Sequence, residues 1–320
     1  MNTYSFSDAL TGSTIQCDYP GLQTLMVEAD GMPQPCETLF FPGCSFINYG
    51  MPLVDAVYAT LKDAGVVEGI SLLCCGKILK YEPNGTEIRA NYEKQLCERL
   101  AALGVKTIVT ACPNCVKALR DAVARDAAEA DIEIIPLPAV LADLGYRIDS
   151  DGALALLSAV VEAGKDYFEP GLADQVPMFC IHDSCPDRKT GEFAAGVRTL
   201  LADEAYNECE HNRKTSFCCG SLVRATGNYE AADAQAQRHG DEAIAAQATG
   251  IVTVCVSCAF QLSMAQRRVP VFHYLELLYN YRIDWYSADA WMKLRFLFDE
   301  SLGVDEFQKS HRSFIGLEKA

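Results

Sequence analysis

The stretch GISLLCCG, at residues 69–76, joins a short apolar run to two adjacent cysteines and a glycine. A short apolar run of this kind is typical of a buried strand. The glycine permits a tight turn and a close approach of the backbone to a bulky ligand. The same Cys-Cys-Gly sequence returns at residues 218–220. Such self-similarity indicates that one structural unit is used twice.

In each half of the chain, a lone cysteine, an adjacent pair and a Cys-x-x-Cys pattern follow one another. They are Cys44, Cys74–Cys75 and Cys112 with Cys115 in the first copy, and Cys185, Cys218–Cys219 and Cys255 with Cys258 in the second. Between the groups lie 29 and 36 residues in the first copy, and 32 and 35 in the second. Because a strand–helix unit takes roughly 30 residues, we expect each group one such unit after the last.

Short apolar runs lead into the cysteine groups, and longer segments with helical spacing of apolar residues lie between them. The predicted strands are 37–41, 69–73, 106–110, 176–181, 215–217 and 250–254, and the predicted helices include 52–64, 86–103 and 228–246. Alternating strands and helices predict a mostly parallel sheet flanked by helices, with ligands at the carboxyl ends of the strands. We therefore predict an α/β fold with two pseudo-symmetric Rossmann-like domains, whose cysteines converge at one sheet edge.

The repeat also sets the predicted domain boundaries. Cysteine-rich domain 1 is expected at 36–146 and cysteine-rich domain 2 at 174–280, joined by a linker helix within 147–173. Residues 1–35 have little periodicity and are interpreted as an N-terminal extension. Residues 281–320 form a C-terminal extension with aromatic residues among charges, which suits either a packed helix or a segment that docks a partner.

Composition narrows the class of protein. Half of the 320 residues are apolar and 22% are charged, which excludes a disordered or collagen-like chain. The net charge of −16 argues against nucleic acid, which needs clustered Lys and Arg. No run approaches the roughly 20 apolar residues of a transmembrane segment, and the start lacks the pattern of a secretory signal. We expect a cytoplasmic protein that meets a membrane only through a partner.

Fifteen cysteines in such a chain point to metal binding or redox chemistry, because reducing compartments keep thiols free. Thiolates favour zinc, Cu(I) and iron–sulfur clusters. Zinc takes four ligands, typically from two Cys-x-x-Cys pairs, whereas each copy offers five sulfurs. Adjacent cysteines can reach different irons of a larger cluster. We therefore favour a multinuclear iron–sulfur centre in each copy, with zinc or inert buried thiols as the alternatives.

At these residues, over 36–280, the chain resembles the cysteine-rich CCG domain. That domain occurs twice in the B subunit of heterodisulfide reductases, and also in iron–sulfur subunits of anaerobic glycerol-3-phosphate, glycolate and lactate-oxidising systems. The resemblance implies a noncubane [4Fe–4S] cluster in each copy. Cys44, Cys74, Cys75, Cys112 and Cys115 would hold one, and Cys185, Cys218, Cys219, Cys255 and Cys258 the other. Residues 271–278 look like the closing strand and helix start of the family.

His182 and Asp183 look like the His-Asp lead-in of the family, with Ser184 where proline is more common. His182 is a candidate catalytic residue, because imidazole titrates near neutrality and can donate a proton to a thiolate leaving group. A histidine before a ligand loop more often shapes the turn through backbone hydrogen bonds, and we favour that interpretation.

The chain has no ferredoxin-type cysteine run and no Gly-x-Gly-x-x-Gly turn for flavin or nicotinamide. The resemblance then implies a ferredoxin-like iron–sulfur subunit and a flavin-containing subunit as partners. We predict an oxidoreductase subunit, similar to the B subunit of heterodisulfide reductases, that is active in a complex and reduces a disulfide or other small substrate. The alternatives are an electron-transfer subunit that links a flavin dehydrogenase to quinone or another carrier, and a zinc-stapled scaffold.

Several residues fall outside the two sets. Lys77, Lys80 and Arg224 follow the Cys-Cys-Gly turns, where cations would offset clustered thiolates or simply be solvated. Cys97 and Cys180 are predicted to be core residues, and His273 to be structural. Cys17, Cys36 and Cys209 have no predicted role.

Overall fold

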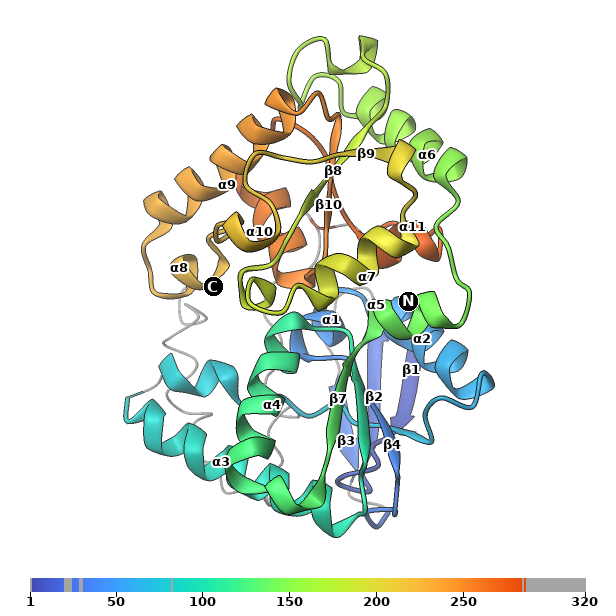
Figure 1. Cartoon of the computed structure of the whole chain (residues 1–320), viewed down its shortest axis with the longest axis vertical. Coiled ribbons are helices and arrows are strands. Elements are labelled where there is room, and N and C mark those ends of the chain that lie inside the picture. Colours follow the sequence, from blue (N-terminus) through green and yellow to red (C-terminus); the bar gives the residue numbers. More distant parts are fainter. Residues whose placement is uncertain (1, 20–24, 29–30, 82, 284, 286–320) are drawn as a thin grey trace. The chain divides into compact units, whose positions relative to one another are not determined.

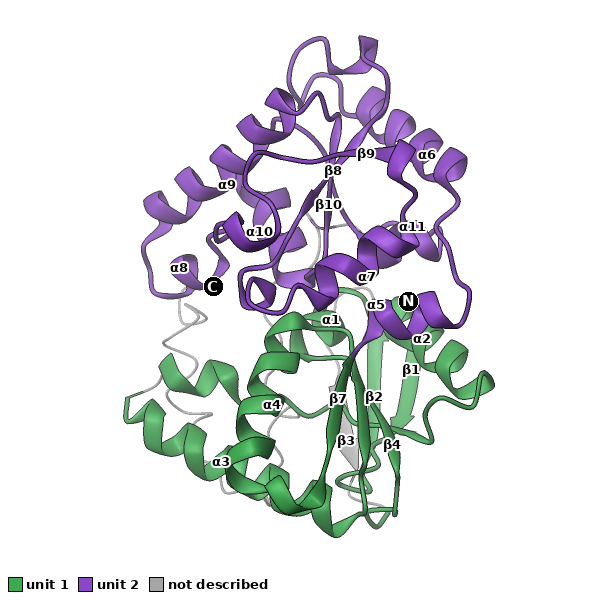
Figure 2. Cartoon of the chain, viewed as in Figure 1, with its two compact units in different colours: residues 1–135, 287–320 green, residues 136–286 purple. Residues whose placement is uncertain are grey.

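The computed structural model describes residues 2–19, 25–28, 31–81, 83–283 and 285. They form two compact units, which divide between Ile135 and Pro136 (Figure 2). Unit 1 contains the described residues up to Ile135, and unit 2 contains those from Pro136 onward. The boundaries drawn from the sequence at 146 and 173 stay predictions, and the C-terminal extension lies almost wholly outside the described residues.

Unit 1 is built on a four-stranded sheet. Its strands are β4 (Thr38–Phe41), β5 (Gly69–Ile70), β6 (Thr107–Thr110) and β7 (Glu133–Pro136), and its helices are α1 (Cys44–Tyr49), α2 (Met51–Asp63), α3 (Gly85–Ala102) and α4 (Pro113–Asp126), with short 3-10 helices η1 (Lys77–Tyr81) and η2 (Ala128–Ala130). The strand order is β5-β4-β6-β7, and β4 pairs in parallel with β5 and β6. Leu39, Phe40 and Ile108 are fully buried, as expected for strands that are covered on both faces.

Helix α2 shows why the helical segments are recognisable in the sequence. Val54, Val57 and Leu61 are three and four residues apart, so they share one face of the helix, and all three are fully buried. A proline in the first turn suits the start of the helix. The helix therefore forms because its apolar face is buried against the rest of the unit.

Unit 2 repeats the arrangement. Its strands are β8 (Phe179–His182), β9 (Tyr206–Asn207), β10 (Gly250–Thr253) and β11 (Val271–His273), and its helices are α5 (Leu137–Asp143), α6 (Ser150–Ala163), α7 (Glu192–Leu200), α8 (Ser221–Ala225), α9 (Tyr229–Ala245), α10 (Val256–Ala265) and α11 (Tyr274–Leu278). Four short 3-10 helices join them, η3 (Leu172–Asp174), η4 (Cys185–Asp187), η5 (Asp203–Ala205) and η6 (Arg213–Thr215). The strand order is β9-β8-β10-β11, and all three pairings are parallel.

The two sheets therefore share one topology. In each, the first strand of the repeat lies inside the sheet, the second lies at the edge, and the third and fourth follow on the other side. In unit 2, α9 and α10 lie on one side of the sheet and α7 on the other (Figure 1), as right-handed crossovers require for this order. The predicted α/β fold with two pseudo-symmetric domains is confirmed.

One predicted strand is wrong. Residues 215–217 were expected to be a strand, but Thr215 ends the 3-10 helix η6 and the next two residues have no regular secondary structure. The edge strand is β9, whose two residues carry no apolar run. Side-chain hydrogen bonds decide the local structure instead, because Asn212 and Thr215 form a capping box around η6.

The N-terminal segment contains a sheet that the sequence did not predict. Strands β1 (Asn2–Ser7), β2 (Thr14–Tyr19) and β3 (Leu25–Glu28) form an antiparallel sheet. The fully buried carboxylate of Asp8 accepts hydrogen bonds from the Ser71 hydroxyl at 2.9 Å and from the Leu72 N–H at 2.6 Å. Burial raises the pKa of Asp8, against the effect of these bonds. The segment is thus tied to the loop that follows β5.

Glu276 binds the last described residues of unit 2 through hydrogen bonds. This buried carboxylate, in the first turn of α11, accepts hydrogen bonds from the His273 N–H at 2.6 Å, from Arg282 at 2.9 Å and from the Ile283 N–H at 2.8 Å. The His273 side chain completes a capping box with the same turn, which is a structural role. Within the described part of the chain, every helix is too short or too polar to span a bilayer.

Glu276 should make the stability of unit 2 depend on pH. Burial raises its pKa from 4.5 to about 7, against the effect of Arg282. The folded state then holds a proton that the unfolded state lacks between these values, so the free energy of unfolding falls as the pH rises through this window, by about 3 kcal/mol. The Glu276→Gln variant should show a smaller fall in urea denaturation between pH 4.5 and 7.

The exposed Glu204 provides the matched control, since Glu204→Gln changes the same atoms without burial. It should leave the pH dependence as in the wild type. Identical profiles for the wild type and Glu276→Gln would show that Glu276 is ionised throughout this range.

Candidate metal centres

In each unit, three neighbouring strands deliver the cysteines to one edge of the sheet. In unit 1, β4 leads to Cys44 at the start of α1, β5 leads to Cys74–Cys75, and β6 leads to Cys112 and Cys115 at the start of α4. In unit 2, β8 leads to Cys185, and β10 leads to Cys255 and Cys258 at the start of α10. Cys218–Cys219 come eleven residues after the end of β9.

The five thiols of each set make one continuous series of hydrogen-bonding contacts. In unit 1 the series runs Cys44, Cys74, Cys75, Cys115, Cys112. In unit 2 it runs Cys185, Cys218, Cys219, Cys258, Cys255. Each member of one series occupies the place of its counterpart in the other. The structure thus brings together every cysteine of the two predicted sets, and none of the ten is in a disulfide.

Both sets are largely enclosed. Cys44 is partly exposed in the first set and Cys185 and Cys218 in the second, whereas the other seven cysteines are buried. The second set therefore has the more open side.

The pKa values of the thiols indicate that each set needs a bound cation to be fully ionised. Hydrogen bonds from Cys115 and Cys74 lower the pKa of Cys75, while hydrogen bonds with their neighbours and burial raise the pKa of Cys74 and Cys115. In unit 2 the contacts with Cys185 and Cys219 lower the pKa of Cys218 to about 2. In each series one thiolate, Cys75 or Cys218, is therefore flanked by two thiols whose pKa is raised. Full ionisation of five such sulfurs needs a bound cation, so the donor set fits a thiophilic metal or an iron–sulfur cluster.

Glycine is required at three points around the sets. Gly43 has φ +86°, and a Cβ there would lie 2.8 Å from Cys112 Cβ and 3.1 Å from Cys115 Sγ. Gly76 and Gly220, after the cysteine pairs, have φ +78° and +96°, and a Cβ would lie 2.6 Å from Tyr92 Cδ1 and from the Ala232 carbonyl oxygen respectively. These values confirm the predicted tight turns.

Asp183 lies in the loop between β8 and Cys185 and binds the segment that precedes Cys218. Its buried carboxylate accepts two hydrogen bonds from Arg198, at 2.8 and 2.9 Å, and one from the Arg213 N–H at 2.5 Å. Its carbonyl oxygen accepts a hydrogen bond from the Ser216 hydroxyl at 2.6 Å. Glu208 holds the other edge of the Arg198 guanidinium at 2.7 and 2.8 Å. Asp183, one residue after His182, thus fixes this turn, and a turn-shaping role of His182 itself stays a prediction.

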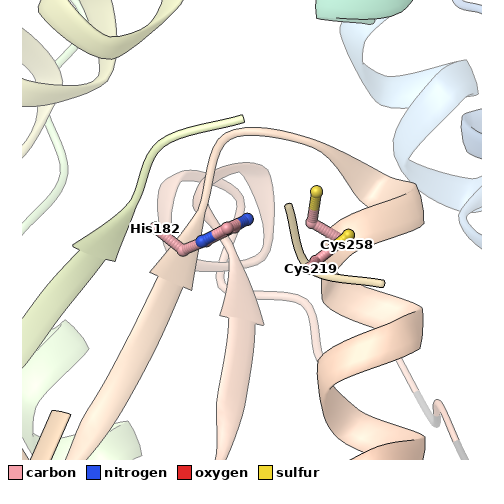
Figure 3. A group of neighbouring side chains, drawn as sticks. All are labelled: His182, Cys219 and Cys258. Carbon is pink, nitrogen blue, oxygen red and sulfur yellow. The ribbon is translucent and has the colours of Figure 1, made fainter. Parts of the chain in front are cut away.

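His182 lies against the second set. One of its ring nitrogens is within 4.8 Å of the sulfurs of Cys219 and Cys258, toward which the ring is directed (Figure 3). The Ser184 hydroxyl lies 3.9 Å from the Cys258 sulfur. Burial lowers the pKa of His182, although the charges of Asp183 and the neighbouring cysteines act in the opposite direction. Proton donation by His182 stays a prediction.

The sequence did not single out His239, which completes the surroundings of His182. Its ring contacts His182 edge-on, with centroids 4.3 Å apart, and stacks on Phe217 at 3.9 Å. Burial lowers the pKa of His239 to about 2. His239 lies within α9 and belongs to no sequence motif, so the sequence alone does not indicate that it contacts His182.

Of the three cations after the Cys-Cys-Gly turns, Lys77 acts on the thiols. It donates a hydrogen bond to Asn114, and its charge contributes to lowering the pKa of Cys75. Lys80 lies over the Tyr81 ring at 4.7 Å. Arg224 pairs with Asp233 and donates to Gln261 at 2.8 Å.

The five remaining cysteines are buried and are not members of the two series of contacts. They are Cys17, Cys36, Cys97, Cys180 and Cys209. Burial raises the pKa of Cys17 and of Cys97 to about 12, which makes unreactive thiols. Cys180 contacts Cys209, and the two line a small cavity together with His182, His211 and His239.

Comparison with known proteins identifies the family. The family model of the CCG cysteine-rich domain matches residues 38–120 and again 179–263, more than half of the chain. The chain therefore belongs to the CCG cysteine-rich domain family. CCG domains are found in oxidoreductase-related iron–sulfur proteins, and together with the many cysteines they indicate metal binding of the iron–sulfur type.

No curated protein matches the chain. Among solved structures, a glutamate racemase isoform from Bacillus anthracis has a TM-score of 0.34 and 11% identity, and the match covers 75% of this chain and 77% of the racemase. An aspartate racemase homologue from Pyrococcus horikoshii has a TM-score of 0.30 and 11% identity, over 76% of this chain and 96% of its own. Similarity at this level carries no argument about function.

The close packing of Gly43 can be tested by substitution. Gly43→Ala places a Cβ against Cys112 and Cys115 in a left-handed backbone, and should cost about 1–2 kcal/mol for the conformation and about 1–3 kcal/mol for the clash. Gly65→Ala is the matched control, because Gly65 has φ +67° and no atom within 4 Å of the added Cβ. Urea denaturation should show the larger loss for Gly43→Ala. Equal losses would mean that the sulfur set yields to the added methyl group.

Proposed function

We propose that the chain is an iron–sulfur oxidoreductase subunit whose ten patterned cysteines hold two clusters. The observation that supports this is the pair of five-thiol series, which share one contact order at the carboxyl ends of equivalent strands. Their donors are sulfur atoms, and five is one more than a single zinc ion or an ordinary cubane takes. This excess supports noncubane [4Fe–4S] clusters, of the type that the resemblance to the B subunit of heterodisulfide reductases implies.

The proposed substrate is a disulfide or another small molecule. Reduction of a disulfide consumes two electrons and two protons and releases two thiols. Iron–sulfur clusters, when bound, exchange single electrons, so two centres match the electron count. The partly exposed Cys185 and Cys218 mark the open side of the second set, and His182 lies beside that set.

The electrons are proposed to come from partner subunits, one ferredoxin-like with iron–sulfur clusters and one containing flavin. The absence of a ferredoxin-type cysteine run and of a Gly-x-Gly-x-x-Gly turn from the sequence supports this division of labour. The protein would then be active as part of a complex.

A single zinc ion in the second set is the second candidate, because a nitrogen of His182 and the sulfurs of Cys219 and Cys258 lie within 4.8 Å of one another. Three such donors and one further sulfur would complete a tetrahedral zinc site. Metal analysis separates the two candidates.

The cluster assignment predicts the iron content. Protein purified without oxygen should be brown and contain about eight irons per chain if each set holds a four-iron cluster. Cys75→Ser should remove roughly half of this iron, because it breaks the middle of the first series of contacts. Iron is measured by colorimetric assay, and zinc by emission spectrometry.

The buried Cys97 in α3 supplies the control, since Cys97→Ser removes a thiol outside the two series. It should keep all the iron. Full iron in Cys75→Ser would refute the ligand assignment, and a colourless protein with one or two zinc ions would refute the clusters.

A substrate assay separates a catalyst from an electron relay. The dithionite-reduced protein, mixed anaerobically with small-molecule disulfides, should release two thiols per disulfide consumed, as measured by thiol titration. A protein that keeps its full iron and releases no thiol from any of them would instead be an electron-transfer subunit.

A further inference from the structure

The two copies differ at one equivalent position beside the sulfur sets. Strand β4 ends at Phe41 and strand β8 ends at His182, each three residues before the lone cysteine of its set. The equivalence extends to the pairing, because Phe41 pairs with Thr110 at the end of β6 and His182 with Thr253 at the end of β10. One place in the repeat is therefore apolar in unit 1 and an imidazole in unit 2.

The imidazole of His182 is buried and faces sulfur. The residue is 5% exposed, and its Nε2 has no hydrogen-bond partner among the described residues. One ring nitrogen lies within 4.8 Å of both the Cys219 and Cys258 sulfurs (Figure 3). His239 contacts the ring edge-on and is itself stacked on Phe217, so the orientation of His182 is supported by packing. A buried polar nitrogen without a partner is costly, and the two nearby sulfurs can accept a hydrogen bond from it.

A donor role fits better than a ligand role. The first set has the same five sulfurs in the same contact order without any nitrogen at this position, where Phe41 stands. The second set therefore does not need the nitrogen to complete its ligands. A neutral imidazole carries one N–H, and a hydrogen bond from N–H to a thiolate is charge-assisted.

We propose that His182 donates a hydrogen bond to the sulfur pair of Cys219 and Cys258, and thereby raises the reduction potential of the centre held by the second set. A hydrogen bond to a ligand sulfur offsets negative charge on it, which stabilises the reduced and more negative state. This inference rests on the proposed function, since it requires an iron–sulfur centre. His182 acts here as a positioning and tuning residue. In the first set Lys77 supplies positive charge near Cys75 instead, so the two centres are tuned by different groups.

The test is an anaerobic redox titration of the full chain, followed by electron paramagnetic resonance, for the wild type, His182→Phe and His182→Gln. His182→Phe places the residue of unit 1 at the equivalent position of unit 2. It should lower the midpoint potential of the second centre and leave that of the first unchanged. His182→Gln keeps an N–H donor and should recover at least half of the shift. The Cys75→Ser variant, which retains the second centre, assigns the signals.

The outcomes separate this inference from the proposed function. A wild type without iron would overturn both. A wild type with eight irons, combined with equal potentials in the wild type and His182→Phe, would overturn the hydrogen bond alone, and so would equal shifts in His182→Phe and His182→Gln. Loss of iron from the second set in His182→Phe would make the imidazole a ligand, which also contradicts the proposal.

Discussion

Each unit depends on the approach of five sulfur atoms, because thiols that lose their protons together repel one another in a buried site. Local sequence cannot achieve this, since the cysteines come from segments separated by 29 to 36 residues. The parallel sheet achieves it by ending three neighbouring strands at one edge. Glycines such as Gly43 then let the backbone come close enough for the sulfurs to touch. The fold of each unit is thus the means by which mutually repelling ligands are held in contact.

The two units hold the loop before the cysteine pair by related means. In each, a buried aspartate binds the backbone of that loop. In unit 1 it is Asp8, which comes from the N-terminal segment and binds Leu72. In unit 2 it is Asp183, which comes from the loop after β8 and binds Arg213. A carboxylate that accepts several hydrogen bonds can fix a loop that lacks regular structure. The two copies therefore share their sulfurs and differ in the groups that support them.

The sequence predicted what periodicity and spacing encode. Apolar runs identified β4, β6, β8 and β10, nearly all of whose residues are buried, and the spacing of the cysteines identified the edge at which they meet. The two-residue strand β9 has no apolar run, so the sequence does not reveal it and the edge strand is wrongly predicted at residues 215–217. The N-terminal sheet was missed although its strands alternate polar and apolar residues, with Phe6 of β1 and with Ile15 and Cys17 of β2 buried. Long-range side-chain contacts, such as Asp8 with Ser71 or His182 with His239, leave no local pattern and become visible only in the folded chain.

The placement of α5 has a practical consequence. This helix follows β7, the last strand of the first repeat, yet it belongs to unit 2, where it packs on α7 so closely that a Cβ on Gly196 would lie 2.9 Å from the Ala139 nitrogen. The boundary between the two compact units therefore lies before α5. Anyone who expresses the halves as separate polypeptides should cut ahead of Pro136, so that the second fragment keeps the helix on which it closes. A cut after α5 would leave the first fragment with an apolar helix that has lost its packing partner. The second fragment would then expose the face of α7 that α5 covers.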